Sequence, residues 1–416
     1  MFLNINVIGL IIATIVAPSL GVPFPQTQGD VKAIPERWIV TLKPGISRQK
    51  ATDHLDWTRS IHQRTVSRRQ TGGVERSFGI GNFQAYTGEF DGQTVAEIKA
   101  REVRQKVLAV ESDQEASLAA LTEVGNQPWG LASISSRAPL SDPNLDRQTY
   151  IYDNSAGTGT FAYVLDSGIR ISHPDFQGRA VRGHNVWPEV PFDDDFGHGT
   201  HVAGTVASSR FGVAKNATIV DVKTTRGAYG TAAKIIEALE WSVLNITGTP
   251  GRAGKSVVSM SLGYIATATS TAINRAVDAA TELGIFFVVG AGNDGFDASA
   301  KSPASAPTAF TVGAIGINNT RPSWSNFGPS VDVFAAGVDV RSTSLYQDGT
   351  ELLSGTSMAT PYVAGLALYL RALEGARLDS PAAIAGRIRE LATMDVVLDA
   401  GTGSPNLLAY NGNGLR

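Results

Sequence analysis

The chain has 416 residues, of which 43% are hydrophobic and 18% are charged, and its formal net charge at pH 7 is −3. This composition is typical of a folded protein, and the length exceeds that of one ordinary domain. The small negative charge offers no basic surface for nucleic acid, so no such partner is expected. The chain contains no cysteine, so we expect a large buried core rather than disulfide bonds to stabilise it.

The first 21 residues resemble a signal peptide for secretion. The apolar run at residues 5–16 is too short to span a bilayer comfortably, and Ser19 and Gly21 give the small-x-small pattern of a cleavage site. No lysine or arginine precedes this run, and a buried strand or helix is the alternative. No other stretch has the character of a membrane span, so we expect a secreted, extracellular protein without a membrane partner. Three Asn-x-Thr sequons are candidate N-glycosylation sites, at Asn216, Asn245 and Asn318.

The region 22–119 alternates strand and helix patterns. In chain order we expect a strand at 37–43, a helix at 48–60, a strand at 83–90, a helix at 94–103 and a strand at 106–112. This alternation predicts a small α+β domain of ferredoxin type. A basic polar linker precedes the second strand and is interpreted as a solvated loop, with Arg64, Arg68 and Arg69.

The region 120–416 alternates apolar strands with helices in a different way. The expected strands lie at 218–222, 256–261 and 285–289, and the expected helices at 231–244 and 270–283. Such alternation predicts an α/β domain with a parallel sheet covered on both faces. Ser380 and Pro381 mark the start of a further helix, because a capping serine precedes a proline in the first turn.

Three segments of this second region place reactive side chains at the ends of elements. Asp166 ends the apolar run 161–166, a predicted buried strand, and carboxylates at that edge of a parallel sheet face the crevice. His198 lies in a glycine-flanked turn before a helix of small residues. Ser357 precedes the predicted helix 358–374, whose free N–H groups stabilise nearby negative charge. The simpler interpretation of this serine alone is a helix N-cap.

The three residue types together suit nucleophilic catalysis. A serine hydroxyl needs a base near neutral pH, which histidine supplies, and the base needs a carboxylate to orient it. The chain order is Asp166, His198, Ser357. This order differs from those of the α/β-hydrolases and of chymotrypsin, and it is the order of subtilisin.

The segments around these residues resemble the three signatures of subtilisin-like serine proteases. They are VLDSGI at 164–169, HGTHVAG at 198–204 and GTSMATP at 355–361. Two more segments, PWGL at 128–131 and HPDF at 173–176, are similar to the proteinase K branch found in fungi. The resemblance covers almost the whole chain. It implies a three-layer α/β catalytic domain, a serine endopeptidase of broad, mainly apolar specificity, no cofactor for catalysis, and a monomer.

The resemblance also implies a role for each site residue. Ser357 would attack the scissile carbonyl, His198 would take and return the proton, and Asp166 would orient His198. Asn293, in the segment 290–295, would hold the oxyanion together with the Ser357 N–H group. A binding-only protein on the same fold is the main alternative, which the complete triad disfavours. Proteinase K-like enzymes often carry a cysteine after the second histidine, where this chain has Val202.

Two alternative interpretations of these motifs fit less well. The segment 290–295 has the Gly-x-Gly-x-x-Gly spacing of nucleotide-binding loops, but residues 296–307 contain two prolines and no helical periodicity. His198 and His201 are three apart with no glutamate between them, unlike the zinc-protease pattern. His201 is therefore expected to be structural. The neighbouring acidic residues are interpreted as a solvated turn, at Asp193, Asp194 and Asp195.

Substrate and calcium sites are implied by the resemblance alone. The peptide substrate would lie as an added strand between two segments, with contacts at Gly227, Gly230, Ser261, Leu262 and Gly263. Tyr264 stands where many relatives have glycine and would narrow a pocket. A structural Ca²⁺ would be held by the carboxylate of Asp332 and the carbonyls of Pro307 and Ala309. The alternative is that Asp332 only hydrogen-bonds the loop.

Residues 86–90 and 110–115 resemble the inhibitory propeptides of subtilisin-like proteases. The resemblance implies a propeptide that assists folding and whose tail occupies the cleft of its own enzyme. We therefore predict a signal peptide at 1–21, a propeptide at 22–119 and a catalytic domain at 120–416. Because the tail is small and apolar, we expect self-cleavage between Ala119 and Thr122.

Overall fold

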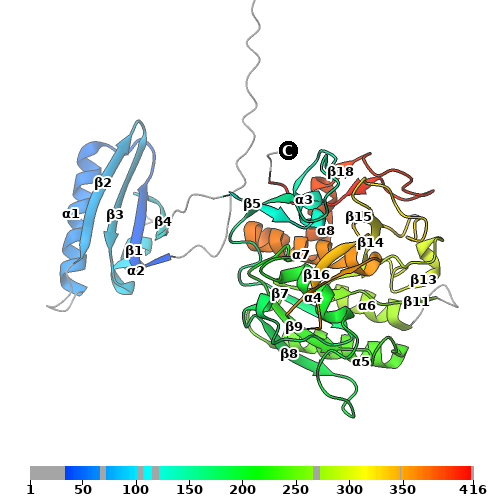
Figure 1. Cartoon of the computed structure of the whole chain (residues 1–416). Coiled ribbons are helices and arrows are strands. Elements are labelled where there is room, and N and C mark those ends of the chain that lie inside the picture. The colour runs from blue at the N-terminus through cyan, green and yellow to red at the C-terminus, as the bar shows by residue number, and fades with distance from the viewer. Residues whose placement is uncertain are drawn as a thin grey trace, which may run out of the picture.

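The structure of the chain is a computed structural model that describes residues 33–65, 72–100, 106–114, 121–265, 272–346 and 348–413. Figure 1 shows two sets of elements, one at the N-terminal end and one formed by the rest of the chain. Each set has its own buried hydrophobic core. Among the described residues, no helix is long and apolar enough to cross a membrane.

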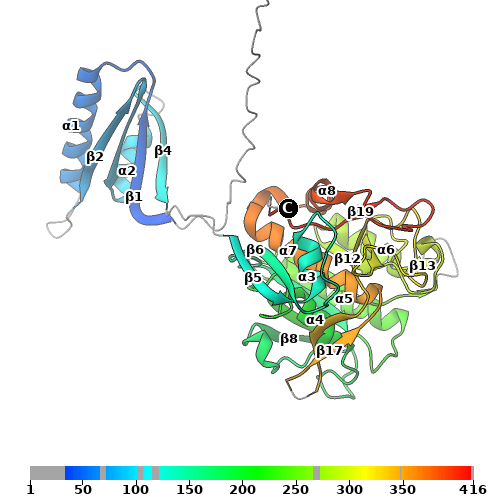
Figure 2. The same ribbon diagram turned by 45° about the horizontal axis from the view of Figure 1, so that its top comes forward.

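The N-terminal set is a four-stranded antiparallel sheet with two helices. Its elements are β1 (Ala33–Leu42), α1 (Arg48–Thr65), β2 (Gly73–Ile80), β3 (Phe83–Glu89), α2 (Gly92–Ala100) and β4 (Val107–Gln114). The strand order β2-β3-β1-β4 is the ferredoxin-like arrangement expected from the sequence. Its core is small and includes Val40, Tyr86 and Ile98, all fully buried. Figure 2 shows both helices against the sheet.

The strand β2 was not expected from the sequence. All of its residues after the first two are exposed, and Arg76 interrupts the alternation of Val74, Phe78 and Ile80 that would mark a half-buried strand. Its backbone pairs with β3, from Gly73 opposite Glu89 to Ile80 opposite Phe83. Part of the predicted linker is therefore helix or strand: Arg64 belongs to α1, whereas Arg68 and Arg69 lie outside the described residues.

The rest of the chain is built around a nine-stranded sheet in the order β18-β19-β15-β14-β12-β10-β7-β9-β8. All neighbouring strands are parallel except β18 and β19. The strands are β7 (Phe161–Asp166), β8 (Ala180–Asn185), β9 (Thr218–Lys223), β10 (Ser256–Met260), β12 (Phe286–Gly290), β14 (Phe310–Ile315), β15 (Val333–Ala336), β18 (Thr393–Met394) and β19 (Leu407–Leu408). The expected parallel α/β sheet is confirmed.

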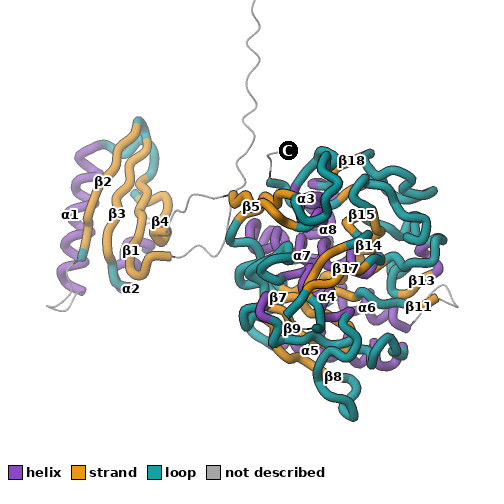
Figure 3. The backbone as a smooth tube through the Cα atoms, in the orientation of Figure 1, coloured by secondary structure: helices purple, strands orange, loops and turns teal. Residues whose placement is uncertain are grey.

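Helices cover both faces of this sheet. The helices are α3 (Trp129–Ser135), α4 (His198–Ala207), α5 (Ala232–Gly248), α6 (Ala272–Glu282), α7 (Thr356–Glu374) and α8 (Pro381–Leu391). Alternate residues of β7 point to opposite faces: Val164 packs with α4 and α7, whereas Tyr163 and Leu165 pack with α5 and α6. These two cores make three layers, which Figure 3 shows as strands between helices.

Short elements complete the larger domain. Three two-stranded sheets pair β5 (Leu121–Gln127) with β6 (Gln148–Asp153), β11 (Tyr264–Ile265) with β13 (Lys301–Ser302), and β16 (Val340–Thr343) with β17 (Thr350–Leu353). Short 3₁₀ turns occur at η1 (Pro174–Phe176), η2 (Ala298–Ala300) and η3 (Gly375–Leu378). The predicted start of α8 is confirmed, because the Ser380 side chain accepts a bond from the Ala383 N–H.

Candidate active site

The carboxylate of Asp166 lies at the carboxyl end of β7, inside the sheet. Its side chain is 4% exposed, and its carbonyl accepts bonds from the N–H groups of Thr224 and Thr225. One carboxylate oxygen, Oδ1, accepts the Ser167 N–H at 2.8 Å. Parallel strands bring their carboxyl ends to one edge, so the predicted position of Asp166 in a crevice follows from the sheet order.

His198 begins α4 and faces this carboxylate. Its Nδ1 donates to Asp166 Oδ1 at 2.7 Å. The approach depends on Gly199, because a Cβ atom at that residue would collide with the carbonyl oxygen of Gly168. Glycine after the histidine therefore lets the start of α4 press against the end of β7.

The environment of His198 alters its pKa. Burial lowers the pKa of the imidazole, but the charge and hydrogen bond of Asp166, with the charge of Asp194, outweigh burial and raise the pKa above the ordinary 6.5. The protonated ring is thus stabilised by the carboxylate that also orients it. His201, by contrast, is fully buried beside the carbonyls of Val340 and Glu351, and burial lowers its pKa to about 4. The expected structural role of His201 agrees with this environment.

Ser357 is the second residue of α7 and opens into the same cavity as His198. Its Oγ donates to the carbonyl oxygen of Ser261 at 3.2 Å, and the Ser261 hydroxyl donates to the Ser357 carbonyl at 2.8 Å. In the part of the chain that the structure describes, Ser357 Oγ makes no hydrogen bond to His198. Such bonds are often long in enzymes without substrate, and a rotation of the hydroxyl is needed before proton transfer.

The amide of Asn293 is held in one orientation beside Ser357. Its Oδ1 accepts from both the N–H and the hydroxyl of Thr356, at 2.8 and 2.9 Å. With the oxygen bonded to Thr356, the NH₂ group is the part of the amide left to act as a donor, and Asn293 lines the cavity. The N–H of Gly292 in turn donates to the Thr356 hydroxyl at 3.1 Å. This contact of Thr356 was not predicted from the sequence, although its place next to Ser357 was an available signal.

These residues line one cavity of about 360 Å³. Its wall includes the four predicted catalytic and oxyanion residues, Asp166, His198, Asn293 and Ser357. Of the predicted substrate contacts, Gly227, Ser261, Leu262 and Gly263 line it, whereas Gly230 is not part of the lining. Lining residues that were not predicted include Phe196, Asp294 and Lys301. Lys301 and Asp294 form an ion pair at 2.8 Å, which places charge in the wall of a cavity whose substrates were expected to be mainly apolar.

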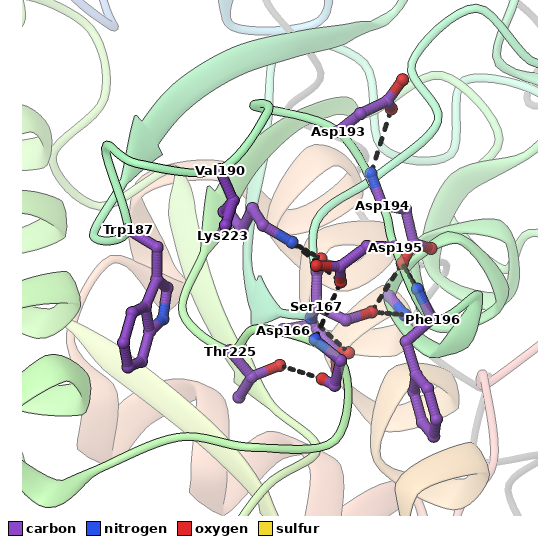
Figure 4. A network of polar contacts seen from close by, with 12 residues as sticks. Asp166, Ser167, Trp187, Val190, Asp193, Asp194, Asp195, Phe196, Lys223 and Thr225 are labelled. Carbon is purple, nitrogen blue, oxygen red and sulfur yellow. Dashed lines mark hydrogen bonds and ion pairs between the residues drawn. The ribbon is translucent and has the colours of Figure 1, made fainter.

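The acidic residues before His198 are not one solvated turn, contrary to expectation. Asp194 is buried, and its carboxylate accepts bonds from Ser167 Oγ, Phe196 N, Gly197 N and both donors of Thr200. Asp193 pairs with Arg182 at 3.0 Å, and Asp195 lies 2.9 Å from Lys223 Nζ. Figure 4 shows Asp195 beside Lys223, Asp194 beside Ser167 and Phe196, and Asp193 accepting the Asp194 N–H. The sequence gives three identical side chains, and only the fold assigns each a partner.

The contacts of Asp332 do not fit the predicted calcium ion. Its Oδ1 pairs with Arg389 Nη2 at 2.6 Å, and its Oδ2 accepts the Thr311 N–H at 2.7 Å. Both oxygens are therefore engaged within the protein, one of them by a guanidinium group, and a calcium ion would have to displace these partners. The observed partners of Asp332 belong to β14 and α8.

The three sequons differ in their surroundings. Asn216 and Asn318 are exposed and lie outside helices and strands. Asn245 lies within α5, where its Oδ1 accepts bonds from Tyr163 and Arg252, both at 2.6 Å. Glycosylation requires an accessible asparagine amide, so the first two sites fit this modification better than Asn245.

Comparison of the chain with known proteins shows which family it resembles. A family model described as "Subtilase family" matches residues 157–414, and one described as "Peptidase inhibitor I9" matches residues 37–119. The chain is 46% identical over 411 residues to "Alkaline protease 1" of Aspergillus flavus, covering 97% of this chain and 98% of the relative. It is 45% identical over 407 residues to "Subtilisin-like proteinase Mp1" of Magnaporthiopsis poae, covering 95% of this chain and 96% of the relative.

A solved structure agrees with these sequence matches. It is a crystal structure of a cold adapted subtilisin-like serine proteinase, with a TM-score of 0.61 and 37% sequence identity. The match covers 69% of this chain and 98% of that one. The expected subtilisin-like fold and the small N-terminal inhibitor domain are thereby confirmed. The chain belongs to the subtilase family of serine proteases and carries an I9 inhibitor propeptide.

Proposed function

We propose that this protein is a secreted endopeptidase that cuts peptide bonds through Asp166, His198 and Ser357. The single observation that carries the assignment is the 2.7 Å hydrogen bond from His198 Nδ1 to the buried Asp166, at the wall of a cavity that also contains Ser357. It leaves Nε2 of the ring for the serine proton. The family and the class of reaction are established by the matches above; the assignment of these three residues is inferred from their geometry.

The proposed reaction is acyl transfer in two steps. Ser357 Oγ rotates away from the Ser261 carbonyl, gives its proton to His198 Nε2, and bonds to the scissile carbonyl carbon. His198 then gives that proton to the leaving amine, and the peptide C–N bond breaks. In the second step water attacks the acyl-enzyme, with His198 again taking and returning the proton. Asp166 stabilises the imidazolium in both steps.

The oxyanion is assigned to two donors. The Ser357 N–H lies in the first turn of α7, and the Asn293 amide is turned toward the cavity because Thr356 holds its oxygen. Preorganised donors of this kind stabilise the charge that develops on the carbonyl oxygen, and loss of one such side chain costs about a hundred- to thousand-fold in turnover in subtilisin.

Peptide substrates are proposed to lie between the segments 227–230 and 261–263. Ser261, Leu262 and Gly263 line the cavity. In the segment 227–230, Gly227 donates its N–H to Asp195, and its carbonyl accepts from Thr225, so its own polar groups are engaged within the protein. Backbone pairing with an extended substrate would tolerate many sequences. Broad specificity follows, although the charges of Asp294 and Lys301 modify the mainly apolar preference.

Secretion and self-processing complete the proposal. The predicted signal peptide and the predicted cleavage between Ala119 and Thr122 both fall on or beside residues outside the described ranges. The I9 domain supports a propeptide that inhibits the enzyme in the same chain. The maturation bond and the boundary at 119 stay predictions, which N-terminal sequencing of the active enzyme tests.

The triad is tested with a covalent label. Wild-type enzyme should react with a sulfonyl fluoride at Ser357, as located by intact mass and peptide mapping. Ser357→Ala should fold, take no label, leave casein intact and remain uncut as a purified zymogen. Removing His198 as well should cost little more activity, because triad members act as a unit. Normal casein hydrolysis by Ser357→Ala would refute the assignment.

A further inference from the structure

A fully buried lysine lies behind the edge of the sheet that carries the triad. Lys223 ends β9, beside Asp166 in the register of the sheet, and its side chain has no exposed surface. A buried ammonium group needs partners to offset its lost hydration. Its Nζ donates to the Ser167 carbonyl at 2.6 Å and lies 2.9 Å from Asp195 Oδ1. Lys223 therefore links the segment after β7 to the turn that precedes His198.

The same oxygen of Asp195 makes a second bond across the cavity wall. Asp195 Oδ1 accepts the Gly227 N–H at 2.9 Å, and Figure 4 shows Asp195 beside Lys223. Gly227 has a φ of +54°, and it stands in a tight turn in which Arg226 and Tyr229 exchange backbone bonds of 2.8 and 3.0 Å. The turn 226–229 is therefore held by its own backbone bonds and, in addition, by the bond from Gly227 to Asp195. We call this turn the cleft wall.

The two neighbouring carboxylates bond to other groups. Asp194 accepts hydrogen bonds from donors in its own turn and in α4, and Asp193 pairs with Arg182. Neither has a bond to the cleft wall among the described contacts. Asp195 has no bond to Asp166, His198 or Ser357 either, so its removal leaves the contacts of the reacting groups in place.

We propose that Asp195, held in place by Lys223, is a positioning residue that fixes the cleft wall for extended peptide substrates. Lys223 holds the carboxylate of Asp195, and this carboxylate holds the N–H of Gly227. The position of the cleft wall relative to the turn before His198 therefore depends on Asp195. The inference rests on the proposed function, since it assumes that the substrate backbone lies along the segment 227–230. It predicts an effect on substrate binding that grows with substrate length, and little effect on the chemical step.

The experiment compares substrates of two lengths. Mature wild type and Asp195→Ala are titrated with a sulfonyl fluoride, and KM and kcat are measured for a tetrapeptide p-nitroanilide and for a single-residue ester. Loss of one charge-assisted hydrogen bond is expected to raise the tetrapeptide KM about five- to tenfold. The kcat and the ester KM should change less than about twofold, because the short ester does not reach the cleft wall.

Two matched variants separate positioning from general destabilisation. Asp195→Asn keeps an oxygen that accepts from both Lys223 and Gly227, so its tetrapeptide KM should return to within about twofold of wild type. Asp193→Ala removes a neighbouring, more exposed carboxylate and should behave as wild type. Asp195→Ser, whose hydroxyl is too short to reach both donors, is a second loss-of-acceptor variant should the alanine variant fail to fold.

Three outcomes would overturn the inference. They are an unchanged tetrapeptide KM in the loss-of-acceptor variants, an equal rise for both substrates, and an Asp195→Asn enzyme as impaired as Asp195→Ala. Failure of the proposed function would look different, since wild-type enzyme would then take no sulfonyl fluoride at Ser357 and would hydrolyse neither substrate. That result would remove the basis of this inference together with the function.

Discussion

The two domains bury their sheets to different degrees. Every residue of β10 and β14 in the catalytic domain is buried, because helices cover both faces of that sheet. In the propeptide domain, by contrast, β2 is exposed along most of its length, and Ile80 and Phe83 lie open at the β2–β3 hairpin. Because the free energy gained on folding depends on buried apolar surface, the same substitution should lower the free energy of unfolding far more in the catalytic domain than in the propeptide domain.

The largest expected difference in the free energy of unfolding is between alanine substitutions of one phenylalanine in each sheet. Phe287 in β12 is fully buried, whereas Phe83 in β3 is 45% exposed. Phe287→Ala should lower the free energy of unfolding by about 3–5 kcal/mol through lost burial and a cavity. Phe83→Ala should cost less than about 1 kcal/mol. Thermal unfolding of the uncut Ser357→Ala zymogen measures both, and equal costs would break the comparison.

Substitution of a buried and of an exposed aspartate should change the free energy of unfolding by different amounts for the same reason. Asp194 is buried with donors at both oxygens, whereas Asp56 on α1 is exposed and pairs with Arg59 at 2.8 Å. Asp194→Ala should destabilise the zymogen by about 2–4 kcal/mol, because several buried donors lose their acceptor. Asp56→Ala should stay within about 0.5 kcal/mol, as surface ion pairs contribute little. Denaturant unfolding of the two variants, with Asp194→Asn as an intermediate, provides the check.

At the active site, the effect should fall on rate rather than stability. Thr356→Val removes the hydroxyl that bonds Asn293 Oδ1 and keeps the backbone donor. A less constrained amide should lower kcat by about tenfold, with KM nearly unchanged, because the oxyanion donor acts only in the transition state. Thr356→Ser retains the hydroxyl and is the control. A rise in KM at constant kcat would show that Thr356 does not act through the oxyanion donor.

The smallest expected effect concerns the carboxylate of Asp332. Because Arg389 and the Thr311 N–H already bond both oxygens of this carboxylate, a chelator should leave the melting temperature of the wild-type enzyme unchanged. Arg389→Ala should cost about 1 kcal/mol or less, since the pair is partly exposed. Calcium should then stabilise Arg389→Ala more than wild type, if it binds the freed carboxylate in the folded state. Stabilisation of wild type by calcium, lost in Asp332→Asn, would restore the predicted calcium site.

The sequence was sufficient to predict the elements whose residue types fit only one setting, such as a wholly apolar run that must be a buried strand. The apolar run of β7 and the small residues that flank His198 and Ser357 led to the correct elements and to one shared cavity. The strand β2 was not predicted because Arg76 interrupts its apolar alternation and most of its side chains are exposed. A chain alone could not show that Asp332 has an arginine partner from α8, since the two are brought together only by the fold.

The raised pKa of His198 has consequences of opposite sign for stability and activity. A group whose pKa is higher in the folded state than in the unfolded one stabilises the fold most below the unfolded value near 6.5. That contribution is lost as the pH rises through the folded pKa. Catalysis needs the neutral ring, so activity should appear over the range in which this stabilisation disappears.

The pH dependence of kcat/KM for the mature enzyme tests the Asp166–His198 pair most directly. We expect an acid limb whose midpoint lies above 6.5, because Asp166 and Asp194 raise the pKa of His198. In Asp166→Asn, which keeps the shape of the side chain and removes its charge, the midpoint should move down, and kcat should fall by about four orders of magnitude. A wild-type midpoint below 6.5, or the same midpoint in Asp166→Asn, would contradict the proposed triad.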